Sequence, residues 1–336
     1  MRIISTLAAA LALAVAASGC GGESVEVTAA GGETTLTLVS YSTPREVYAQ
    51  LTKDFARTPA GTGVSFQESY ASSGEQSRAV AAGLPADVVA LSLEPDVTRL
   101  VDAGLVDEGW SDDEHGGMVT DSIVVFAVRK GNPKSIRTWD DLTKEGVEVI
   151  TPNPFTSGGA QWNVMAGYGA QLERGRSPQE AQDYLRRLFR NVSVQDKSAR
   201  EALQTFVGGK GDVLIAYENE SILAQSKGEE LDYVVPDETI LIENPIAVVA
   251  EGEGDDAAAQ AFVGFVRTPA AQRVFGKAGY RPVLAEVLAE FDYPTPPKLF
   301  TIADLGGWGP VRERFFDVED GIMADVQREL GQSLGE

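Results

Sequence analysis

A short stretch near the middle of the chain has the composition of an anion-binding loop. Residues 149–163 read Val-Ile-Thr-Pro-Asn-Pro-Phe-Thr-Ser-Gly-Gly-Ala-Gln-Trp-Asn, and a helical pattern opens at Ser157, Gly158 and Gly159 after an apolar strand end and a proline-rich loop. Small residues at a helix start leave backbone N–H groups uncovered, and the helix dipole favours negative charge at that end. The stretch therefore predicts an anion contact made mainly by the backbone.

Three further helix starts have the same chemistry. Residues 43–46 read as a capping box, with Thr43 as N-cap, proline in the first helical position and glutamate in the third. Residues 73–76 and 198–201 begin with Ser73 and Ser198 in the same way. Ordinary helix capping explains any one of them. Loops after strand C-termini converge at the edge of an open parallel sheet, so the four starts together favour one shared anion site.

The elements that must position these helix starts alternate along the chain. From Thr34 onward strand-like and helix-like patterns follow each other, which is typical of an α/β protein with largely parallel sheets. Helical periodicity places Tyr48, Leu51 and Phe55 on one buried face. The expected strands span residues 36–39, 64–67, 87–91, 123–128, 147–150, 213–216, 233–235 and 246–249.

The 336 residues are enough for two domains, yet no clean linker divides the chain. This pattern favours two lobes that are assembled from discontinuous segments, with crossings near residues 120–122 and 243–245. We expect lobe 1 to contain residues 34–121 and 245–336, and lobe 2 to contain residues 122–244.

Residues suited to catalysis are scarce. His115 is the only histidine and lies in an acidic, loop-like stretch, and Cys20 is the only cysteine. A sulfatase or phosphatase would need a nucleophile and usually a metal, so this alternative is disfavoured. The Gly-Gly-Lys-Gly sequence at 208–211 lacks the spacing of a phosphate-binding loop. We expect no catalytic residue, no metal and no cofactor.

The charge of the chain limits its partners. The formal net charge is -22 and the isoelectric point is near 4.4, so the long-range field repels nucleic acid and anionic lipid surfaces. A small anion can still bind where local dipoles, rather than net charge, hold it.

The N-terminus has the pattern of a secretory signal. Arg2 precedes an apolar run over residues 7–17, which is short for a membrane span, and Ala-Ser-Gly at 17–19 leads to Cys20. Small residues before a cysteine resemble a bacterial lipobox, so residues 1–20 are predicted to be a signal peptide whose Cys20 is lipidated. The alternative is an ordinary secretory signal with an incidental cysteine. Residues 21–33 are expected to be a flexible tether.

Four motifs together resemble the sulfate-binding proteins of bacterial ABC importers, in their lipid-anchored actinobacterial branch. The motifs cover residues 40–48, 128–133, 149–163 and 211–220, and Leu-Phe-Thr-Ile at 299–302 with Gly-Gly-Trp at 306–308 support them. The resemblance implies a two-lobed periplasmic-binding-protein fold of type II, with the ligand between the lobes. It also implies a monomer anchored outside the cytoplasmic membrane, which captures sulfate or thiosulfate and delivers it to a membrane permease.

The resemblance also implies which residues bind the anion. The ligand-binding positions carried over from the family are Ser42, Ser73, Ser157, Gly158, Gly159, Ala199 and Tyr217. All of them would act as neutral donors, through backbone N–H groups or side chains. The family's ion-pairing arginine beside the cleft corresponds to Arg200.

This chain departs from the family pattern in ways that bear on selectivity. Ser-Thr-Pro at 42–44 suggests a one-residue shift in the first loop, Glu75 replaces a lysine, and Tyr217 stands where tryptophan is usual. Tyrosine can accept a hydrogen bond as well as donate one, whereas indole only donates. Tyr217, and Glu75 if it points inward, are therefore expected to relax the rejection of protonated anions. Molybdate, tungstate and phosphate remain alternative ligands, and a surface adhesin or signalling lipoprotein remains an alternative function.

Overall fold

The computed structural model describes residues 25–27, 34–250 and 256–334. The predicted signal peptide and Cys20 lie outside these residues. Within them, no helix combines the length and apolar character that a membrane crossing requires.

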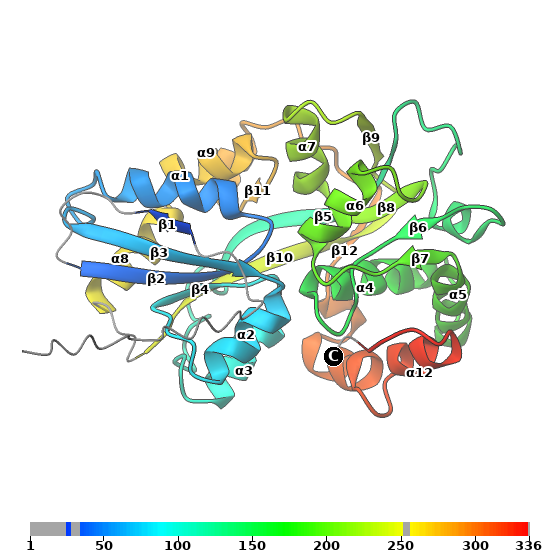
Figure 1. The fold of residues 1–336 in the computed structure, drawn as a ribbon, viewed down its shortest axis with the longest axis horizontal. Coiled ribbons are helices and arrows are strands. Elements are labelled where there is room, and N and C mark those ends of the chain that lie inside the picture. Colours follow the sequence, from blue (N-terminus) through cyan, green and yellow to red (C-terminus); the bar gives the residue numbers. More distant parts are fainter. Residues whose placement is uncertain (1–24, 28–33, 251–255, 335–336) are drawn as a thin grey trace, which may run out of the picture.

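The chain forms an α/β structure with two lobes (Figure 1). Its strands are β1 Val25–Val27, β2 Thr34–Tyr41, β3 Val64–Ala71, β4 Val88–Ala90, β5 Met118–Arg129, β6 Val149–Ile150, β7 Val192–Val194, β8 Val213–Tyr217, β9 Leu231–Val234, β10 Glu238–Val248, β11 Arg281–Pro282 and β12 Lys298–Phe300. Its α-helices are α1 Arg45–Phe55, α2 Ser73–Ala81, α3 Glu94–Asp102, α4 Gly158–Glu173, α5 Pro178–Arg190, α6 Ala199–Val207, α7 Glu218–Ser226, α8 Asp256–Val266, α9 Pro269–Lys277, α10 Ala285–Leu288, α11 Trp308–Val311 and α12 Ile322–Glu329. Short 3-10 helices span Trp139–Thr143 and Ala303–Leu305, and a π-helix spans Arg312–Phe316.

Lobe 1 is built on the parallel strands β3, β2 and β4. Helices α1, α8 and α9 pack on one core of this lobe, where Leu36, Phe66 and Phe262 are buried. β1 adds antiparallel to β3, with Val25 opposite Glu68. The expectation of a flexible tether over residues 21–33 is therefore wrong for Val25–Val27, because an alternating Val-Glu-Val segment can extend the edge of the sheet.

Two long strands carry the chain between the lobes. β10 pairs with β4 through Ile246–Val248 and with β5 through Leu241–Pro245, while β5 continues into lobe 2 and pairs with β8. The sequence pattern located only one end of each strand, at 123–128 and 246–249. The missed part of β10, residues 238–245, mixes Glu, Asn and Pro with apolar residues, so its strand character comes from pairing rather than from composition.

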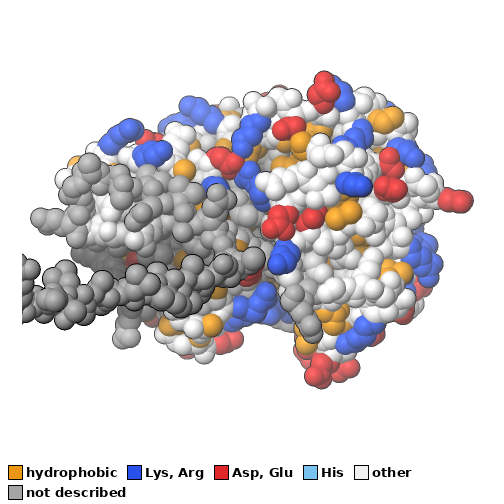
Figure 2. Space-filling view, in the orientation of Figure 1, with side chains coloured by type: hydrophobic (Ala, Val, Ile, Leu, Met, Phe, Trp, Pro, Cys, Tyr) orange, Lys and Arg blue, Asp and Glu red, His pale blue; other side chains and the backbone are white. Residues whose placement is uncertain are grey.

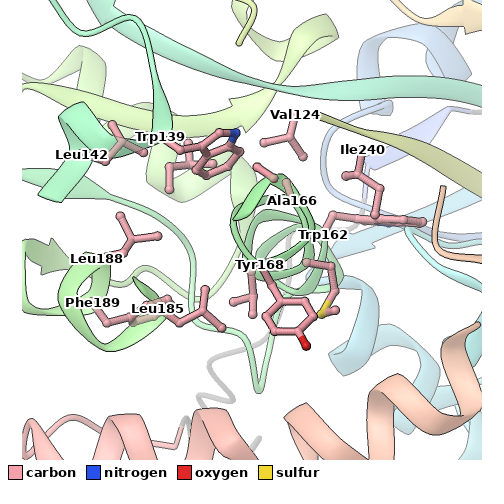
Figure 3. Packing of buried hydrophobic residues seen from close by; sticks show 14 of the residues in the cluster. Val124, Trp139, Leu142, Trp162, Ala166, Tyr168, Leu185, Leu188, Phe189 and Ile240 are labelled. Carbon is pink, nitrogen blue, oxygen red and sulfur yellow. The ribbon is translucent and has the colours of Figure 1, made fainter. Parts of the chain in front are cut away.

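Lobe 2 surrounds the buried helix α4. Parallel strands β7, β6 and β8 lie along one edge of β5, to which β8 pairs antiparallel, and β9 pairs with the opposite edge of β5. Figure 3 shows Ala166 and Tyr168 of α4 in the core with Trp139 and with Leu185 and Leu188 of α5. The helix is apolar on most of its circumference because this core covers it from several sides.

The end of the chain packs on lobe 2. β12 pairs with β10, and Phe300, Trp308, Phe315 and Met323 are buried in the same core as Trp162. Assigning all of residues 245–336 to lobe 1 is therefore incorrect for the segment from Lys298 onward. Its apolar residues cover the outer side of α4, where the Trp162 and Trp308 rings meet edge to face at 4.7 Å.

The visible surface mixes both signs of charge. Figure 2 shows Lys and Arg side chains interspersed with Asp and Glu over the described part of this face. Such interspersed charges are typical of a well-solvated protein surface.

Candidate functional site

A small cavity lies where the two lobes meet. Its lining residues are Tyr41, Ser42, Thr43, Ser72, Ser73, Ser92, Ser157, Gly159, Ala199 and Tyr217. The space open to the centre of a water molecule is only about 10 Å³, so this closed form has no room for an organic ligand of ordinary size. Six of the seven predicted ligand-binding residues line it; Gly158 and the predicted ion-pairing Arg200 do not.

The start of α4 forms one wall of the cavity. Ser157 is the N-cap, and its Oγ accepts a hydrogen bond from the Ala160 N–H at 3.4 Å, which leaves the hydroxyl proton for another partner. A Cβ on Gly159 would lie 3.3 Å from the Ala199 Cβ and 3.5 Å from the Tyr217 Cε1, so the glycine keeps this wall open. The first N–H groups of a helix have no partner within the helix.

Gly158 has a different environment from its neighbour. A Cβ at this position would lie 2.5 Å from the Leu93 Cδ2 and 2.7 Å from the Ser92 Oγ. Glycine is therefore needed here for close approach of lobe 1 to the α4 backbone.

Helix α2 starts at the opposite wall, but its capping differs from the prediction. Ser72 is the N-cap, and its side chain makes no capping bond to the helix backbone. Ser73 donates its hydroxyl proton to the Asp96 Oδ2 at 2.7 Å and accepts from the Ser92 N–H at 2.9 Å. Its side chain is thus committed within lobe 1, and only its backbone N–H remains suited to an anion.

Helix α1 also begins differently. Pro44 is the N-cap, and Thr43 does not cap the helix, because its Oγ1 pairs with the Tyr280 hydroxyl at 3.1 Å. The predicted capping box at residues 43–46 is therefore wrong. Ser42 and Thr43 both line the cavity, so the loop itself is still placed at the site.

Helix α6 supplies the fourth start. Ser198 is its N-cap and accepts from the Glu201 N–H at 3.2 Å, so Ala199 is the first residue of the helix and faces the cavity. The Glu201 carboxylate accepts from the Lys197 N–H rather than from Ser198, which makes this only half of the predicted box.

Arg200 lies behind the cavity and joins the lobes. Its guanidinium donates to both carboxylate oxygens of Glu46, at 2.9 and 2.7 Å, and to the Thr43 carbonyl at 2.8 Å. Lys227 contacts the same Glu46 carboxylate at 2.6 Å. Burial opposes ionisation of Glu46, but hydrogen bonds from Arg200 and Lys227 hold its pKa down to about 2. The cations beside the site are thus paired with protein groups.

Tyr217 and Ser92 meet across the cavity. The Tyr217 hydroxyl lies 2.8 Å from the Ser92 Oγ, and both residues are almost fully buried. Burial raises the pKa of Tyr217 well above its usual value, so the phenol stays neutral. The sequence reasoning missed Ser92. Its position directly after the predicted strand 87–91 was the available signal, because strand ends converge on the crevice.

Two acidic residues lie near the cavity but do not line it. Glu75 is exposed and accepts from the Ser72 hydroxyl at 3.3 Å, so it does not point into the cavity. Glu220 is buried behind Tyr217 and Ala199 and lines an adjoining small cavity. Burial raises the pKa of Glu220 to about 7, although Arg200 partly offsets this effect.

The lining is therefore neutral and rich in donors. Among the described residues that line the cavity there are hydroxyls, glycine and alanine backbone, and no Lys, Arg, His, Asp or Glu. The described residues also contain no group of acidic, His or Cys side chains arranged to hold a metal. Such a lining can satisfy the oxygens of a small anion by hydrogen bonds.

Comparison with known proteins places the chain in a family. A family model for bacterial extracellular solute-binding proteins matches residues 36–281. A sulfate-binding protein from Synechococcus elongatus is 41% identical over 326 residues, which covers 93% of both chains. A thiosulfate-binding protein from Pseudomonas aeruginosa is 32% identical over 301 residues, covering 86% of this chain and 90% of that protein.

Solved structures agree with this placement. The sulfate-binding protein SubI from Mycobacterium tuberculosis H37Rv has a TM-score of 0.82 and 46% identity, and the match covers 85% of this chain and 100% of that one. The expected two-lobed α/β fold of a periplasmic binding protein is confirmed. The chain therefore belongs to the bacterial extracellular solute-binding proteins, with relatives named sulfate-binding proteins among those it matches.

Proposed function

We propose that this chain is a binding protein, not an enzyme, that captures sulfate or thiosulfate outside the cell for an ABC importer. The observation that carries the proposal is the neutral cavity between the lobes, to which four helices, α2, α4, α6 and α7, contribute residues of their first turn or N-cap. Relatives named sulfate-binding and thiosulfate-binding proteins, matched over most of their length, support it.

The lining explains why such a site would choose this class of ligand. Sulfate at neutral pH has no proton, so a site made of donors satisfies all of its oxygens. An anion that keeps a proton needs an acceptor, and a buried polar group without a partner costs about 1 to 3 kcal/mol. We propose that Ser157 and the N–H groups of Gly158 and Gly159 make the main contacts with the anion. The other proposed contacts are with Ser42, Ser73, Ala199 and Tyr217.

A titration of the purified domain against a panel of oxyanions tests this function. Isothermal titration with sulfate, thiosulfate, molybdate, tungstate and phosphate should give the tightest binding for sulfate or thiosulfate. Tighter molybdate or tungstate binding would change the ligand and leave the binding class intact. No heat with any oxyanion would refute the capture function and favour an adhesin or signalling role.

Delivery and anchoring complete the proposal. We infer that the closed, ligand-bound form docks on a membrane permease, which accords with hinge closure around ligands in two-lobed binding proteins.

We also infer lipidation at Cys20, from the lipobox-like sequence before it. Mass spectrometry of the membrane-extracted protein should find acyl chains on Cys20, and Cys20→Ala should release the protein into the medium. An unmodified cysteine would refute the anchor.

A further inference from the structure

Ser92 occupies the point where the two lobes meet at the cavity. It follows β4 of lobe 1 and is 1% exposed. Its N–H donates to the Ser73 Oγ at 2.9 Å, and its carbonyl accepts from the Trp162 Nε1 at 2.8 Å and from the Asn244 Nδ2 at 3.1 Å. Three partners from separate elements therefore fix the backbone of Ser92, and the contact with Tyr217 holds its hydroxyl at the cavity.

The only hydrogen-bond partner described for this hydroxyl is Tyr217. The two oxygens lie 2.8 Å apart, and either can be the donor. Two hydroxyls have two protons between them, and one proton is used in the bond that joins them. Since both residues line the cavity, the second proton is available to a ligand from whichever hydroxyl is not donating to the other.

The arrangement of the pair gives it two states. When Ser92 donates to Tyr217, the phenol donates to the ligand and the Ser92 oxygen can accept from it. When Tyr217 donates to Ser92, Ser92 donates to the ligand and the Tyr217 oxygen can accept from it. The neighbouring Ser73 hydroxyl lacks this freedom, because its proton is held by the Asp96 carboxylate.

We propose that Ser92 is a further ligand-binding residue and that Ser92 and Tyr217 act as one reversible hydroxyl pair, which lets the cavity accept a monoprotonated oxyanion as well as a fully deprotonated one. The proposal rests on the oxyanion-binding function proposed above. A protonated anion would donate to Ser92, Ser92 to Tyr217, and Tyr217 to another oxygen of the same anion. Every hydroxyl then has a hydrogen-bond partner, and no proton is transferred from one oxygen to another.

Sulfate and phosphate form a matched pair of probes. In mildly alkaline buffer inorganic phosphate has the same charge and shape as sulfate but keeps one proton. Isothermal titration gives the sulfate affinity, and competition by phosphate gives the phosphate affinity even when it is weak. In Ser92→Ala the sulfate affinity should fall about threefold and the phosphate affinity much more, so the ratio of the two should rise about tenfold.

A second variant and a control separate this role from a structural one. Tyr217→Phe removes the other half of the pair and should raise the same ratio. Ser221→Ala is the control, because Ser221 is also fully buried but lies off the cavity and its hydroxyl has no hydrogen-bond partner among the described residues. It should leave the ratio unchanged.

Three results would overturn the proposal. Equal losses for both anions in Ser92→Ala would give Ser92 a merely structural role. No loss for either anion in Ser92→Ala would place the acceptor elsewhere in the cavity. Tight sulfate binding with no phosphate competition in the natural protein would show that the pair offers no acceptor to a protonated anion. Failure of the natural protein to bind sulfate at all would instead refute the capture function, and this proposal with it.

Discussion

The guanidinium of Arg200 contacts both carboxylate oxygens of Glu46, at 2.9 and 2.7 Å, although 154 residues separate the two in the chain. Glu46 is on α1 in lobe 1 and Arg200 is on α6 in lobe 2. The same guanidinium donates to the Thr43 carbonyl in the loop that lines the cavity. This ion pair therefore links closure of the lobes to the position of a binding loop.

Removing the charge of Glu46 should weaken ligand binding without unfolding the protein. The pair is partly exposed, so Glu46→Gln is expected to lower sulfate affinity by a measurable factor of no more than about five. Isothermal titration measures the change. Glu290→Gln is the matched control, since Glu290 forms a comparable exposed pair with Arg273 away from the cavity. Equal affinities in the natural protein and Glu46→Gln would contradict the link.

The pKa of Glu46 determines the pH range in which the ion pair with Arg200 exists. The pKa of Glu46 is lowered from 4.5 to about 2, so its contribution to stability is fully present above pH 4.5 and is lost as pH falls toward 2. Sulfate affinity should therefore show no dependence on Glu46 ionisation at neutral pH. A titration series between about pH 5 and 8 that gave a different slope for Glu46→Gln would disagree with this expectation.

A bulky side chain at Gly159 should abolish binding while the fold survives. The glycine faces Ala199 and Tyr217 with little space to spare, and it has no positive φ that would strain another residue. Leucine at this position would fill the cavity and cover the helix start. Gly264→Leu serves as control, because that exposed glycine on α8 has open space around it. Retained sulfate affinity in Gly159→Leu, measured by titration, would refute this placement of the anion.

The sequence predicted the parts of the site that depend on local chemistry. The helix start at Ser157 could be recognised because small residues follow a proline-rich loop, and the Ser198 cap because serine precedes a helical pattern. Strand positions in lobe 1 were found from short apolar runs. In each case the signal lies within a few residues of the feature that it predicts.

What the sequence could not predict depends on distant partners. Thr43 resembles an N-cap locally, yet Tyr280 takes its hydroxyl. Ser92 is an ordinary residue after a strand until Tyr217 is brought to it by folding. The return of the segment from Lys298 to lobe 2 depends on pairing with β10, for which nothing in its composition gives a signal.

Two serines at opposite walls should respond differently to alanine. Ser157→Ala removes a hydroxyl proton that is free for the ligand, so affinity should fall about tenfold, and loss of the cap should cost about 1 kcal/mol of stability. Ser73→Ala removes a hydroxyl already used by Asp96 and Ser92, so its main effect should be on stability, by about 1 to 3 kcal/mol. Urea denaturation and titration measure the two quantities. A larger affinity loss in Ser73→Ala than in Ser157→Ala would contradict this division.

The crossing strands should make the stability of the protein dependent on pH. Asp121 on β5 lies directly opposite Glu243 on β10, and Arg281 on β11 is also its cross-strand partner. Burial, followed by repulsion from Glu243, raises the pKa of Asp121 to about 7, although Arg281 partly offsets this. A carboxyl with a raised pKa stabilises the fold at low pH, and this contribution is lost as pH rises through about 7.

The free energy of unfolding should therefore decrease between about pH 4 and 7, and Asp121→Asn should remove much of that decrease. The expected difference is about 1 kcal/mol, discounted because Asp121 keeps some contact with solvent. Urea denaturation at several pH values measures it, with Asp112→Asn as a control at an exposed loop position. If the Asp121→Asn slope equals that of the natural protein, the carboxyl pair at the crossing does not titrate in this range and the strands between the lobes are held together independently of its charge.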